Sequence, residues 1–342
     1  MKAAVLEEVK KLIIRDVPEP EPGPSQVLVK VAACGICGTD IKLYEGKYSA
    51  NVPVILGHEY SGEVIKTGNK VTEIKQGDKI VPDPNESCGA CYWCRSARPC
   101  FCNKLAAYGV LKDGGFAEFA LVGEKGAYKI PEGLDYESAS FAEPVSCAVH
   151  CIDRASIKPG ETVLIIGGGA MGQILVQLAR DSGAGKLIMV TRSRWKLELA
   201  KKFGATDTVC AEENTDEQVL SLTEGLGADV VIEAVGSPQT IELAIRLARK
   251  SGRVVIFGFA PEGEKANFIP FDVLSRELTI MGSWVNPYTF SRSLDILSAG
   301  KIDVKSLVSL KLSLGNIMDG FRAMKEKPEG FMKAMVMFKK EN

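Results

Sequence analysis

Short runs of β-branched and aromatic residues, each broken by glycine or proline, follow one another through the first part of the chain. The runs are QVLVKVAAC, GEVIKTG, DKIVPDP, FAEFALV and AYKIPEG. Short strands at such close spacing are typical of an all-β barrel. Because helical periodicity is nearly absent there, we predict an all-β domain over residues 1–147.

At about residue 148 the pattern changes to strands that alternate with amphipathic helices. Segments such as RWKLELAKKFGA and QTIELAIRLARKSG separate strands predicted at residues 162–166, 187–191, 229–235, 253–259 and 278–281. This alternation predicts a doubly wound parallel sheet over residues 148–284, with helices on both faces. Residues 285–342 have a mixed α and β pattern, which suits a segment that returns to the first domain.

Composition and charge exclude several classes of partner. The 342 residues are 46% hydrophobic and 25% charged, which is ordinary for a globular protein. The net charge of −1 provides no field for binding nucleic acid or an anionic membrane, so we expect neither partner. The N-terminus MKAAVLEEVKKLIIRD lacks the apolar core of a signal peptide, and we expect a cytoplasmic protein. Residues 162–179 carry no charge, but their four glycines favour a strand and a helix over a membrane span.

Four cysteines lie at the spacing of metal ligands in a short loop, at positions Cys88, Cys91, Cys94 and Cys102. Four thiolates bind one tetrahedral Zn²⁺ and leave no position for a substrate, so we predict a structural zinc lobe over residues 85–105. An iron–sulfur cluster is an alternative, since it also takes four thiolates. Four reduced core cysteines are a second alternative, which the polar segment WCRSARPC disfavours. We expect Cys100, between the ligands, to be a spectator.

A second group of potential ligands has mixed chemistry. Cys37 and Thr39 come from GICGTD, His58 and Glu59 from LGHEYSGEV, and Glu143 from FAEPVSCAVH. A set of cysteine, histidine and carboxylate leaves an open position on Zn²⁺, which a metal that binds alcohols requires. A lone histidine is more often a hydrogen-bonded structural residue, so the interpretation depends on the whole set.

These motifs, followed in order by GGGAMG, resemble the zinc-dependent medium-chain alcohol dehydrogenase family over nearly the whole chain. The adjacent His58 and Glu59, with the FAEP segment, are similar to its sorbitol (polyol) and threonine dehydrogenase branch. The resemblance implies a GroES-like barrel domain interrupted by a Rossmann domain. It also implies that Cys37, His58 and Glu59 bind the catalytic zinc, that Glu143 binds the metal or its water, and that the protein is a homo-oligomer, commonly a tetramer.

The glycine-rich segment predicts a dinucleotide site. Gly167, Gly169 and Gly172 follow a predicted strand and open a predicted helix, which is the context that the G-x-G-x-x-G fingerprint needs. The first glycine makes the turn, the second admits the pyrophosphate, and the third lets the helix pack on the strand. Ala170 and Met171, together with Phe259 at the end of a later strand, complete the cofactor contacts expected here.

The residues after the next strand predict which cofactor is preferred. An acidic residue there would bind the ribose 2′-hydroxyl of NAD. Alignment of KKFGA with the same element of the family puts Thr191 at that position, followed by Arg192, Ser193 and Arg194. At about 4 Å a carboxylate would repel a 2′-phosphate by roughly 1 kcal/mol in water, whereas arginine attracts it. We therefore predict NADP(H) over NAD(H), with Lys196 as a further contact.

The resemblance also implies a mechanism, in which Zn²⁺ polarises the substrate oxygen and hydride passes to or from nicotinamide. Thr39 occupies the family's hydroxyl relay position. Many relatives have histidine three residues later, where this chain has Lys42, which either ends the relay or contacts cofactor or substrate, unless solvent takes the proton directly. Animal polyol dehydrogenases have an Arg-Tyr pair after the last Rossmann strand, whereas this chain has Ser283 and Trp284, which disfavours sorbitol itself.

The favoured function is therefore an NADP(H)-linked, zinc-dependent dehydrogenase of a secondary alcohol, with a polyol or sugar alcohol as substrate. One alternative is oxidation of an amino alcohol, as in threonine dehydrogenases. A zinc-free quinone or enoyl reductase of the same fold is another, which Cys37, His58 and Glu59 disfavour. A non-catalytic nucleotide sensor would need no Thr39 relay. We expect His150, near the domain junction, to be structural.

Overall fold

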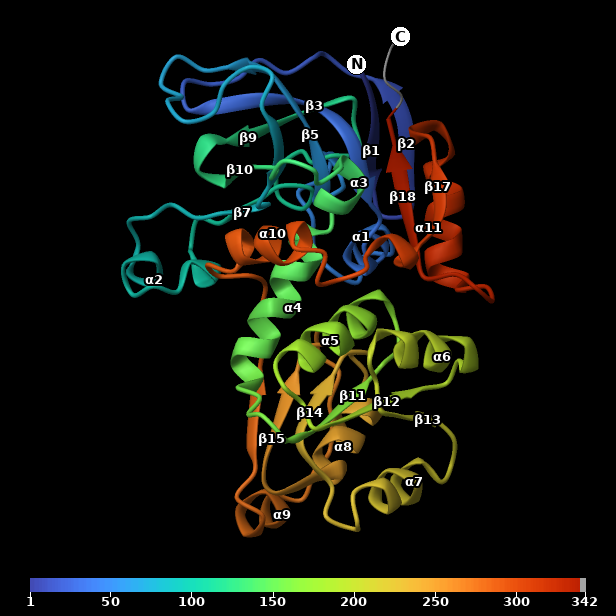
Figure 1. The fold of residues 1–342 in the computed structure, drawn as a ribbon. Helices are drawn as coiled ribbons and strands as arrows, with labels where there is room; N and C mark the ends of the chain where they lie inside the picture. Colours follow the sequence, from blue (N-terminus) through green and yellow to red (C-terminus); the bar gives the residue numbers. More distant parts are fainter. Residues whose placement is uncertain (339–342) are drawn as a thin grey trace. The chain divides into compact units, whose positions relative to one another are not determined.

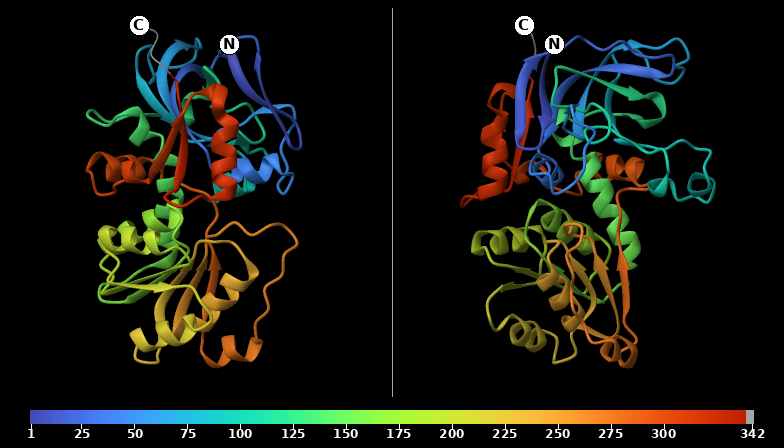
Figure 2. Two further views of the ribbon diagram at one scale, coloured as in Figure 1. Left: turned by 90° about the vertical axis from the view of Figure 1, so that its right-hand side faces the viewer. Right: turned by 180° about the vertical axis from the view of Figure 1, so that it is seen from behind.

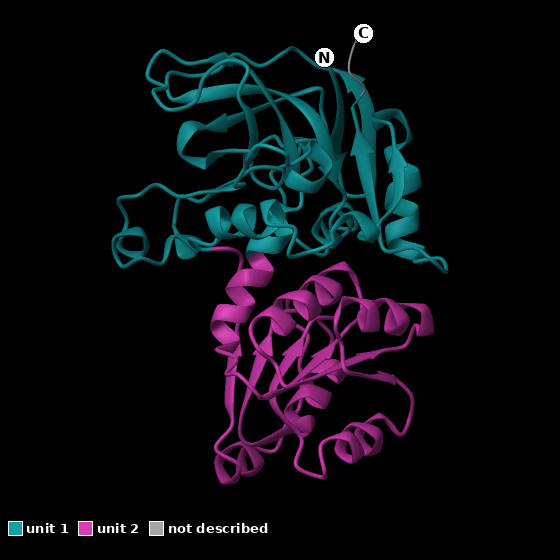
Figure 3. Ribbon diagram, viewed as in Figure 1, with its two compact units in different colours: residues 1–146, 287–342 teal, residues 147–286 magenta. Residues whose placement is uncertain are grey.

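The computed structural model describes residues 1–338, and the chain divides into two compact units (Figure 1; Figure 3). Unit 1 comprises Met1–Ser146 and Pro287–Asn342, and unit 2 comprises Cys147–Asn286. Residues 339–342, the end of the predicted 285–342 segment, lie outside the described part. The predicted architecture, a β-rich domain interrupted by a doubly wound parallel sheet, is confirmed.

Unit 1 is built around a seven-stranded sheet in which β18 pairs antiparallel with β3, so the end of the described chain joins the sheet begun near its start. Its strands are β3 (Gln26–Gly35), β5 (Glu59–Thr67), β6 (Lys79–Pro82), β9 (Phe119–Gly123), β10 (Ala127–Lys129), β17 (Val308–Leu312) and β18 (Lys333–Met337). A three-stranded sheet contains β1 (Lys2–Glu8), β2 (Lys11–Asp16) and β4 (Val54–Ile55), and a small pair contains β7 (Asn85–Glu86) and β8 (Ala106–Ala107). Large apolar side chains such as Leu6, Leu56 and Phe116 fill the core.

The prediction of an all-β domain over residues 1–147 overlooks several short helices and the start of α4, and the one that matters most for the site is α1 (Gly38–Tyr44). This helix is too short to show a repeating apolar pattern, and a capping box starts it. The Cys37 side chain accepts a hydrogen bond from Thr39 N, and the Asp40 carboxylate accepts one from Cys37 N. The other helices that begin or lie in unit 1 are α2 (Tyr92–Arg95), α3 (Tyr136–Ala139), α4 (Ala142–Ala155), α10 (Phe290–Ser298) and α11 (Ile317–Glu326).

Unit 2 is a six-stranded parallel sheet in the order β13-β12-β11-β14-β15-β16. Its strands are β11 (Thr162–Ile166), β12 (Lys186–Thr191), β13 (Asp207–Cys210), β14 (Ala228–Glu233), β15 (Ala248–Ile256) and β16 (Thr279–Gly282). Figure 2 shows helices against both faces of this sheet, as predicted. They are α5 (Ala170–Asp181), α6 (Arg194–Phe203), α7 (Thr215–Leu222), α8 (Pro238–Leu247) and α9 (Pro270–Ser275).

Two strands predicted in unit 2 end earlier than expected, β14 at Glu233 and β15 at Ile256. The side chain of Glu233 accepts hydrogen bonds from the backbone N–H groups of Val235 and Gly236, and this turn ends the strand. The Glu233 carbonyl accepts hydrogen bonds from the next strand's continuation, residues Phe257 and Gly258. The apolar pattern of the sequence alone therefore predicts the ends of both strands a few residues too late in the chain.

The uncharged window at residues 162–179 forms the buried strand β11 and the first part of helix α5, as predicted. Within residues 1–338, no helix has both the length and the apolar character that a membrane crossing requires.

Candidate metal centres and dinucleotide site

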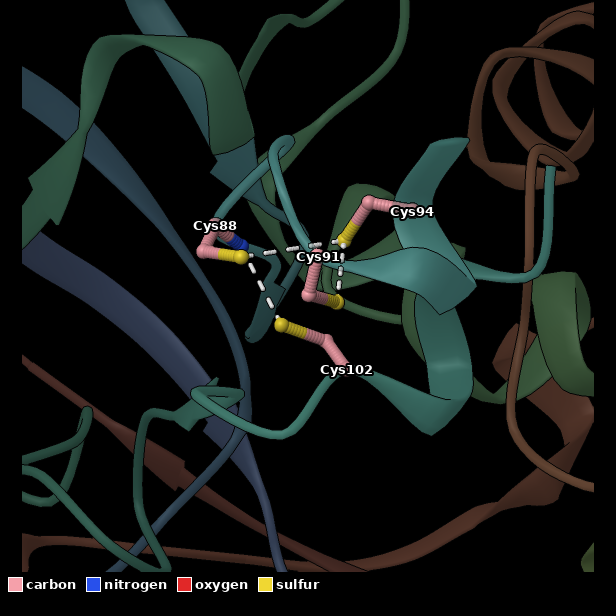
Figure 4. Close-up of side chains that lie close together, drawn as sticks. All are labelled: Cys88, Cys91, Cys94 and Cys102. Carbon is pink, nitrogen blue, oxygen red and sulfur yellow. Dashed lines mark hydrogen bonds between the residues drawn. The ribbon is translucent and has the colours of Figure 1, made fainter. Parts of the chain in front are cut away.

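The four predicted structural ligands, Cys88, Cys91, Cys94 and Cys102, converge at the lobe of unit 1 (Figure 4). Their sulfur atoms all lie within 4.8 Å of one another, with 3.5 Å between Cys91 and Cys94 and 4.0 Å between Cys88 and Cys94. Tetrahedral Zn²⁺ with Zn–S bonds of about 2.3 Å separates its sulfur ligands by about 3.8 Å. The arrangement therefore fits one zinc ion.

Backbone N–H groups around the lobe lower the pKa of Cys88 and Cys91, whereas burial raises the pKa of Cys102. The N–H groups of Cys88 and Lys104 each donate to Cys102 Sγ at 3.3 Å. The backbone N–H of Cys94 is the main cause that lowers the pKa of Cys91 to about 6. A lowered thiol pKa favours the charged form that binds metal. Cys100 is not a member of this converging group.

A second group of ligand atoms converges from Cys37, His58 and Glu59, again within 4.8 Å of one another. Within residues 1–338 these are the two groups of three or more such residues that are close enough to hold a metal ion. Cys37 is the N-cap of α1, whereas His58 precedes β5 and Glu59 begins it, so two short elements position all three. A thiolate, an imidazole and a carboxylate are the ligand types that suit zinc with one position open.

Asp40 lies beside two of these three ligands. One carboxylate oxygen accepts the Cys37 backbone N–H at 2.8 Å, and the other lies 3.4 Å from His58 Nδ1. Asp40 is completely buried. A carboxylate on one imidazole nitrogen leaves the other nitrogen for the metal. Sequence reasoning missed Asp40, although an acidic residue three positions after the Cys37 N-cap is the signal of a capping box.

Lys333 forms a buried ion pair with Glu59. Its Nζ lies 2.5 Å from Glu59 Oε2 and also donates to the Ile36 carbonyl at 3.3 Å. A Cβ at Gly35 would lie 2.2 Å from Glu59 Oε2, so the pair depends on glycine at this position. Nothing in the local sequence pointed to Lys333, because it comes from β18, far along the chain.

Glu143 does not belong to the converging ligand group. It is buried at the start of α4. Burial lowers the pKa of Lys333, but the negative charges of Glu59, Cys37 and Glu143 outweigh this effect and raise it. Glu143 is thus within electrostatic range of Lys333.

Helix α1 carries both predicted relay residues. Thr39 and Lys42 are three positions apart on this helix, which places them on one face. Burial lowers the pKa of Lys42 to about 8; Cys37 opposes this shift, whereas Lys47 and Lys327 add to it. Lys42 therefore has a pKa from which it can exchange a proton near neutral pH.

The glycine turn of unit 2 has the geometry of a dinucleotide site. Gly167 has φ +115°, which favours glycine, and a Cβ at Gly172 would lie 1.8 Å from the Gly167 carbonyl oxygen. Gly169 is the N-cap of α5, and Ala170 and Met171 begin that helix. The free N–H groups at a helix N-terminus bind phosphate. The turn therefore fits a pyrophosphate.

The residues predicted to select the cofactor lie beside this turn. A Cβ at Gly168 would lie 2.8 Å from Thr191 Cγ2, so Thr191 packs against the turn. Arg192 is exposed, and Ser193 is the N-cap of α6 with no side-chain capping bond. The Lys196 ammonium lies 5.2 Å from the Trp195 ring. Cationic and hydroxyl side chains therefore follow Thr191 directly in the chain, and no carboxylate is present at residues 191–196.

Two further predicted residues lie in unit 2. The Phe259 ring, beyond the end of β15, lies 6.1 Å from the ring of Trp284. His150 lies on α4, where burial and the charge of Arg154 lower its pKa. His150 is in neither ligand group, and its structural role stays a prediction.

Two family profiles match the chain, "Alcohol dehydrogenase GroES-like domain" over residues 23–132 and "Zinc-binding dehydrogenase" over residues 170–299. Sorbitol dehydrogenase of Bacillus subtilis is 33% identical over 98% of this chain and 97% of its own length.

Two solved structures share the fold over almost the whole chain. A zinc-binding dehydrogenase of Sinorhizobium meliloti bound to NADP is 42% identical, with a TM-score of 0.93 over 98% of this chain and 99% of that one. A short chain alcohol dehydrogenase of Escherichia coli complexed with NADH is 30% identical, with a TM-score of 0.93 over 99% of both chains.

Proposed function

The chain belongs to the zinc-dependent medium-chain alcohol dehydrogenase family, and from this premise we propose that it oxidises a polyol or sugar alcohol at a secondary hydroxyl with NADP(H). The convergence of Cys37, His58 and Glu59 carries this proposal, because three protein ligands leave one position for the substrate. The coarser function, a zinc-dependent oxidoreductase of alcohols that uses NAD(P)(H), follows from the family itself.

The side chains of the catalytic centre have separate tasks in this proposal. Cys37, His58 and Glu59 would hold a Zn²⁺, which when bound would supply the polarisation that makes the proton of the substrate hydroxyl easier to remove. Asp40 holds the His58 ring in position, and Lys333 balances the Glu59 charge. We assign Glu143 to the same metal, either as an exchanging ligand or through its water. The second zinc, on Cys88, Cys91, Cys94 and Cys102, stabilises the lobe.

Proton transfer uses the face of α1. The Thr39 hydroxyl accepts the substrate proton and passes its own proton on toward Lys42 Nζ. With a pKa of about 8, Lys42 is partly neutral at mildly alkaline pH and can accept that proton. Alternatively, Lys42 contacts the cofactor or the substrate through its charged form.

Unit 2 holds the cofactor in this proposal. Gly167, Gly169 and Gly172 receive the pyrophosphate at the N-terminus of α5, with Ala170 and Met171 beside them, and Phe259 contacts the nicotinamide half.

Thr191, Arg192, Ser193 and Lys196 receive the 2′-phosphate. The absence of a carboxylate at Thr191 supports NADP(H), as does the NADP bound to the Sinorhizobium meliloti relative. The NADH bound to the Escherichia coli relative supports the alternative cofactor.

We also propose that the protein is a homo-oligomer. Phe268, Ile269, Phe271 and Leu274 are all more than half exposed in unit 2. They precede the edge strand β16, whose outer side pairs with no other strand of residues 1–338. Such a patch next to an unpaired edge favours association with a second copy.

A substrate panel tests the proposed function. Polyols, ketoses, simple secondary alcohols and L-threonine are offered to the zinc-loaded protein with NADP⁺ or NAD⁺ (or the reduced cofactors), and the absorbance of reduced nicotinamide is followed. We expect the highest kcat/KM with a polyol and NADP⁺, and loss of activity after the catalytic zinc is removed. Turnover of quinones or enones that survives zinc removal would refute the proposal in favour of a zinc-free reductase.

A further inference from the structure

Gln173 connects two parts of the cofactor site. It lies in the first turns of α5 and is completely buried. Its side-chain Nε2 donates to the Gly168 carbonyl at 3.3 Å and to the Lys196 carbonyl at 2.9 Å. The opposite amide orientation would bring oxygen against both carbonyls, so these two contacts fix the orientation of the side chain.

The two acceptors belong to different phosphate-binding segments. Gly168 lies in the glycine turn, whereas Lys196 is in the first turn of α6, and its N–H donates to the Ser193 carbonyl at 3.1 Å. Thr191 packs against Gly168 from the other end of the same segment. Residues 191–196 are therefore attached to the glycine turn at two points, through Thr191 packing and through the Gln173 amide.

The amide oxygen of Gln173 indicates why a glutamine is present at this position: the N–H groups of the amide are needed, whereas its oxygen is not. Gln173 Oε1 is buried and has no hydrogen-bond partner in the described part of the chain. Leaving a buried acceptor unpaired costs free energy, and an apolar side chain of similar length would avoid that cost. The free energy that offsets this cost must then come from the hydrogen bonds between the amide and the two carbonyls.

We propose that Gln173 is a positioning residue that sets the selectivity for NADP(H) over NAD(H) by holding residues 191–196 at a fixed distance from the glycine turn. This inference rests on the proposed NADP(H) preference. A dinucleotide with a 2′-phosphate binds both segments through charged groups, so it depends on their spacing. NAD(H) has a neutral 2′-hydroxyl in place of that phosphate, so it makes one charged contact, at the glycine turn, and depends on the spacing much less.

The chain contains a matched control for this proposal. Gln177 lies one turn later on α5, is also buried, and its Nε2 donates to the Gln173 backbone carbonyl at 3.4 Å. Gln173→Met and Gln177→Met make the same chemical change in the same helix. Only the first change removes the contacts to Gly168 and Lys196.

Calorimetric titration of each zinc-loaded variant with NADP⁺, NAD⁺ and 2′,5′-ADP tests the proposal. We expect Gln173→Met to raise the Kd for NADP⁺ and 2′,5′-ADP by about fivefold or more, and the Kd for NAD⁺ by less than about twofold. Gln177→Met should leave the ratio of the two Kd values within about twofold of the wild type. A selectivity ratio unchanged in Gln173→Met would overturn the proposal.

A second measurement needs no cofactor. Amide hydrogen exchange in residues 191–196 of the nucleotide-free protein should be faster in Gln173→Met than in Gln177→Met, and equal rates would overturn the proposal. If Gln173→Met does not fold, Gln173→Asn gives the same comparison, since its amide falls short of both carbonyls. A wild-type protein that prefers NAD⁺ would refute the proposed cofactor, whereas the change in ratio would still decide the role of Gln173.

Discussion

The ammonium of Lys333 lies 2.5 Å from the Glu59 carboxylate, and both side chains are almost completely buried. Their elements, β18 and β5, both neighbour β3 in the sheet of unit 1. A carboxylate buried beside Cys37 would otherwise have uncompensated negative charge. The pair therefore makes a buried carboxylate tolerable at a metal centre.

Removing this cation should destabilise unit 1 strongly. Breaking one side of a buried ion pair typically costs about 3–5 kcal/mol, because the remaining charge has no partner. We expect Lys333→Met to lower the free energy of unfolding of the zinc-free protein in urea by this amount, and that of the zinc-loaded protein by less, because the metal also compensates the Glu59 charge. The double variant with Glu59→Gln should be less destabilised than the sum of the single variants.

An exposed pair provides the control for that measurement. Lys2 and Asp16 form an ion pair at 3.4 Å with both side chains more than half exposed. Exposed pairs contribute about 0–1 kcal/mol, so Lys2→Met should have a small effect. Equal effects of Lys333→Met and Lys2→Met would contradict the role assigned to the buried pair.

The two metal centres should be separable by mutation. Elemental analysis of the wild-type protein is expected to give two zinc ions per chain. Cys37→Ser should lose one zinc and the turnover. Its circular dichroism spectrum should stay unchanged, because a zinc with an open position contributes to the reaction more than to the stability of the fold. Cys94→Ser should lose the other zinc and lower the thermal midpoint, since that metal holds the lobe. One zinc in the wild type, or full activity of Cys37→Ser, would contradict this assignment.

A carboxylate at position 191 should reverse the cofactor preference. Thr191 packs against Gly168 of the glycine turn, so an acid there would lie near the 2′ position of the ribose. It would accept the 2′-hydroxyl of NAD⁺ and repel a 2′-phosphate by about 1–4 kcal/mol, which corresponds to about fivefold to several hundredfold in affinity. We expect Thr191→Asp to shift kcat/KM from NADP⁺ toward NAD⁺. Thr191→Ser keeps a neutral hydroxyl and should keep the wild-type preference, and an unchanged preference in Thr191→Asp would exclude this position as the determinant.

The rate of alcohol oxidation should depend on the protonation of Lys42. Burial lowers the pKa of Lys42 to about 8, so its ammonium loses a proton as the pH rises through that value. The neutral amine is the form that accepts a proton from Thr39, and kcat should therefore increase with pH across this range. Lys42→Met should remove that increase, whereas Lys47→Met should keep it and move it to higher pH, because the charge of Lys47 helps to lower the pKa of Lys42. An identical pH profile in Lys42→Met would mean that solvent takes the proton.

The sequence predicted those parts of the site that depend on local patterns. The four-cysteine lobe and the glycine turn are each encoded within one short segment, and their spacing alone indicates their chemistry. Helix α1 was missed because seven residues are too few to show a helical repeat. Lys333 and Gln173 were missed because their roles depend on contacts with distant segments, β5 and α6, which no local pattern records.

The exposed apolar patch of unit 2 should control assembly. Phe271 and Leu274 are 69% and 73% exposed, and they lie on α9, just before the edge strand β16. Large contiguous apolar patches on a protein surface mark sites of association, and an edge strand offers unpaired backbone groups to a second copy. We expect the wild type to be an oligomer by light scattering, and Phe271→Asp with Leu274→Asp to reduce its mass. Leu226→Asp changes a side chain of the same unit that is 67% exposed but outside the patch, so it should leave the mass unchanged. A monomeric wild type would contradict the proposal of a homo-oligomer. Two buried carboxylates are incompatible with a tight apolar contact, so an unchanged mass in the double variant would mean that the interface lies elsewhere.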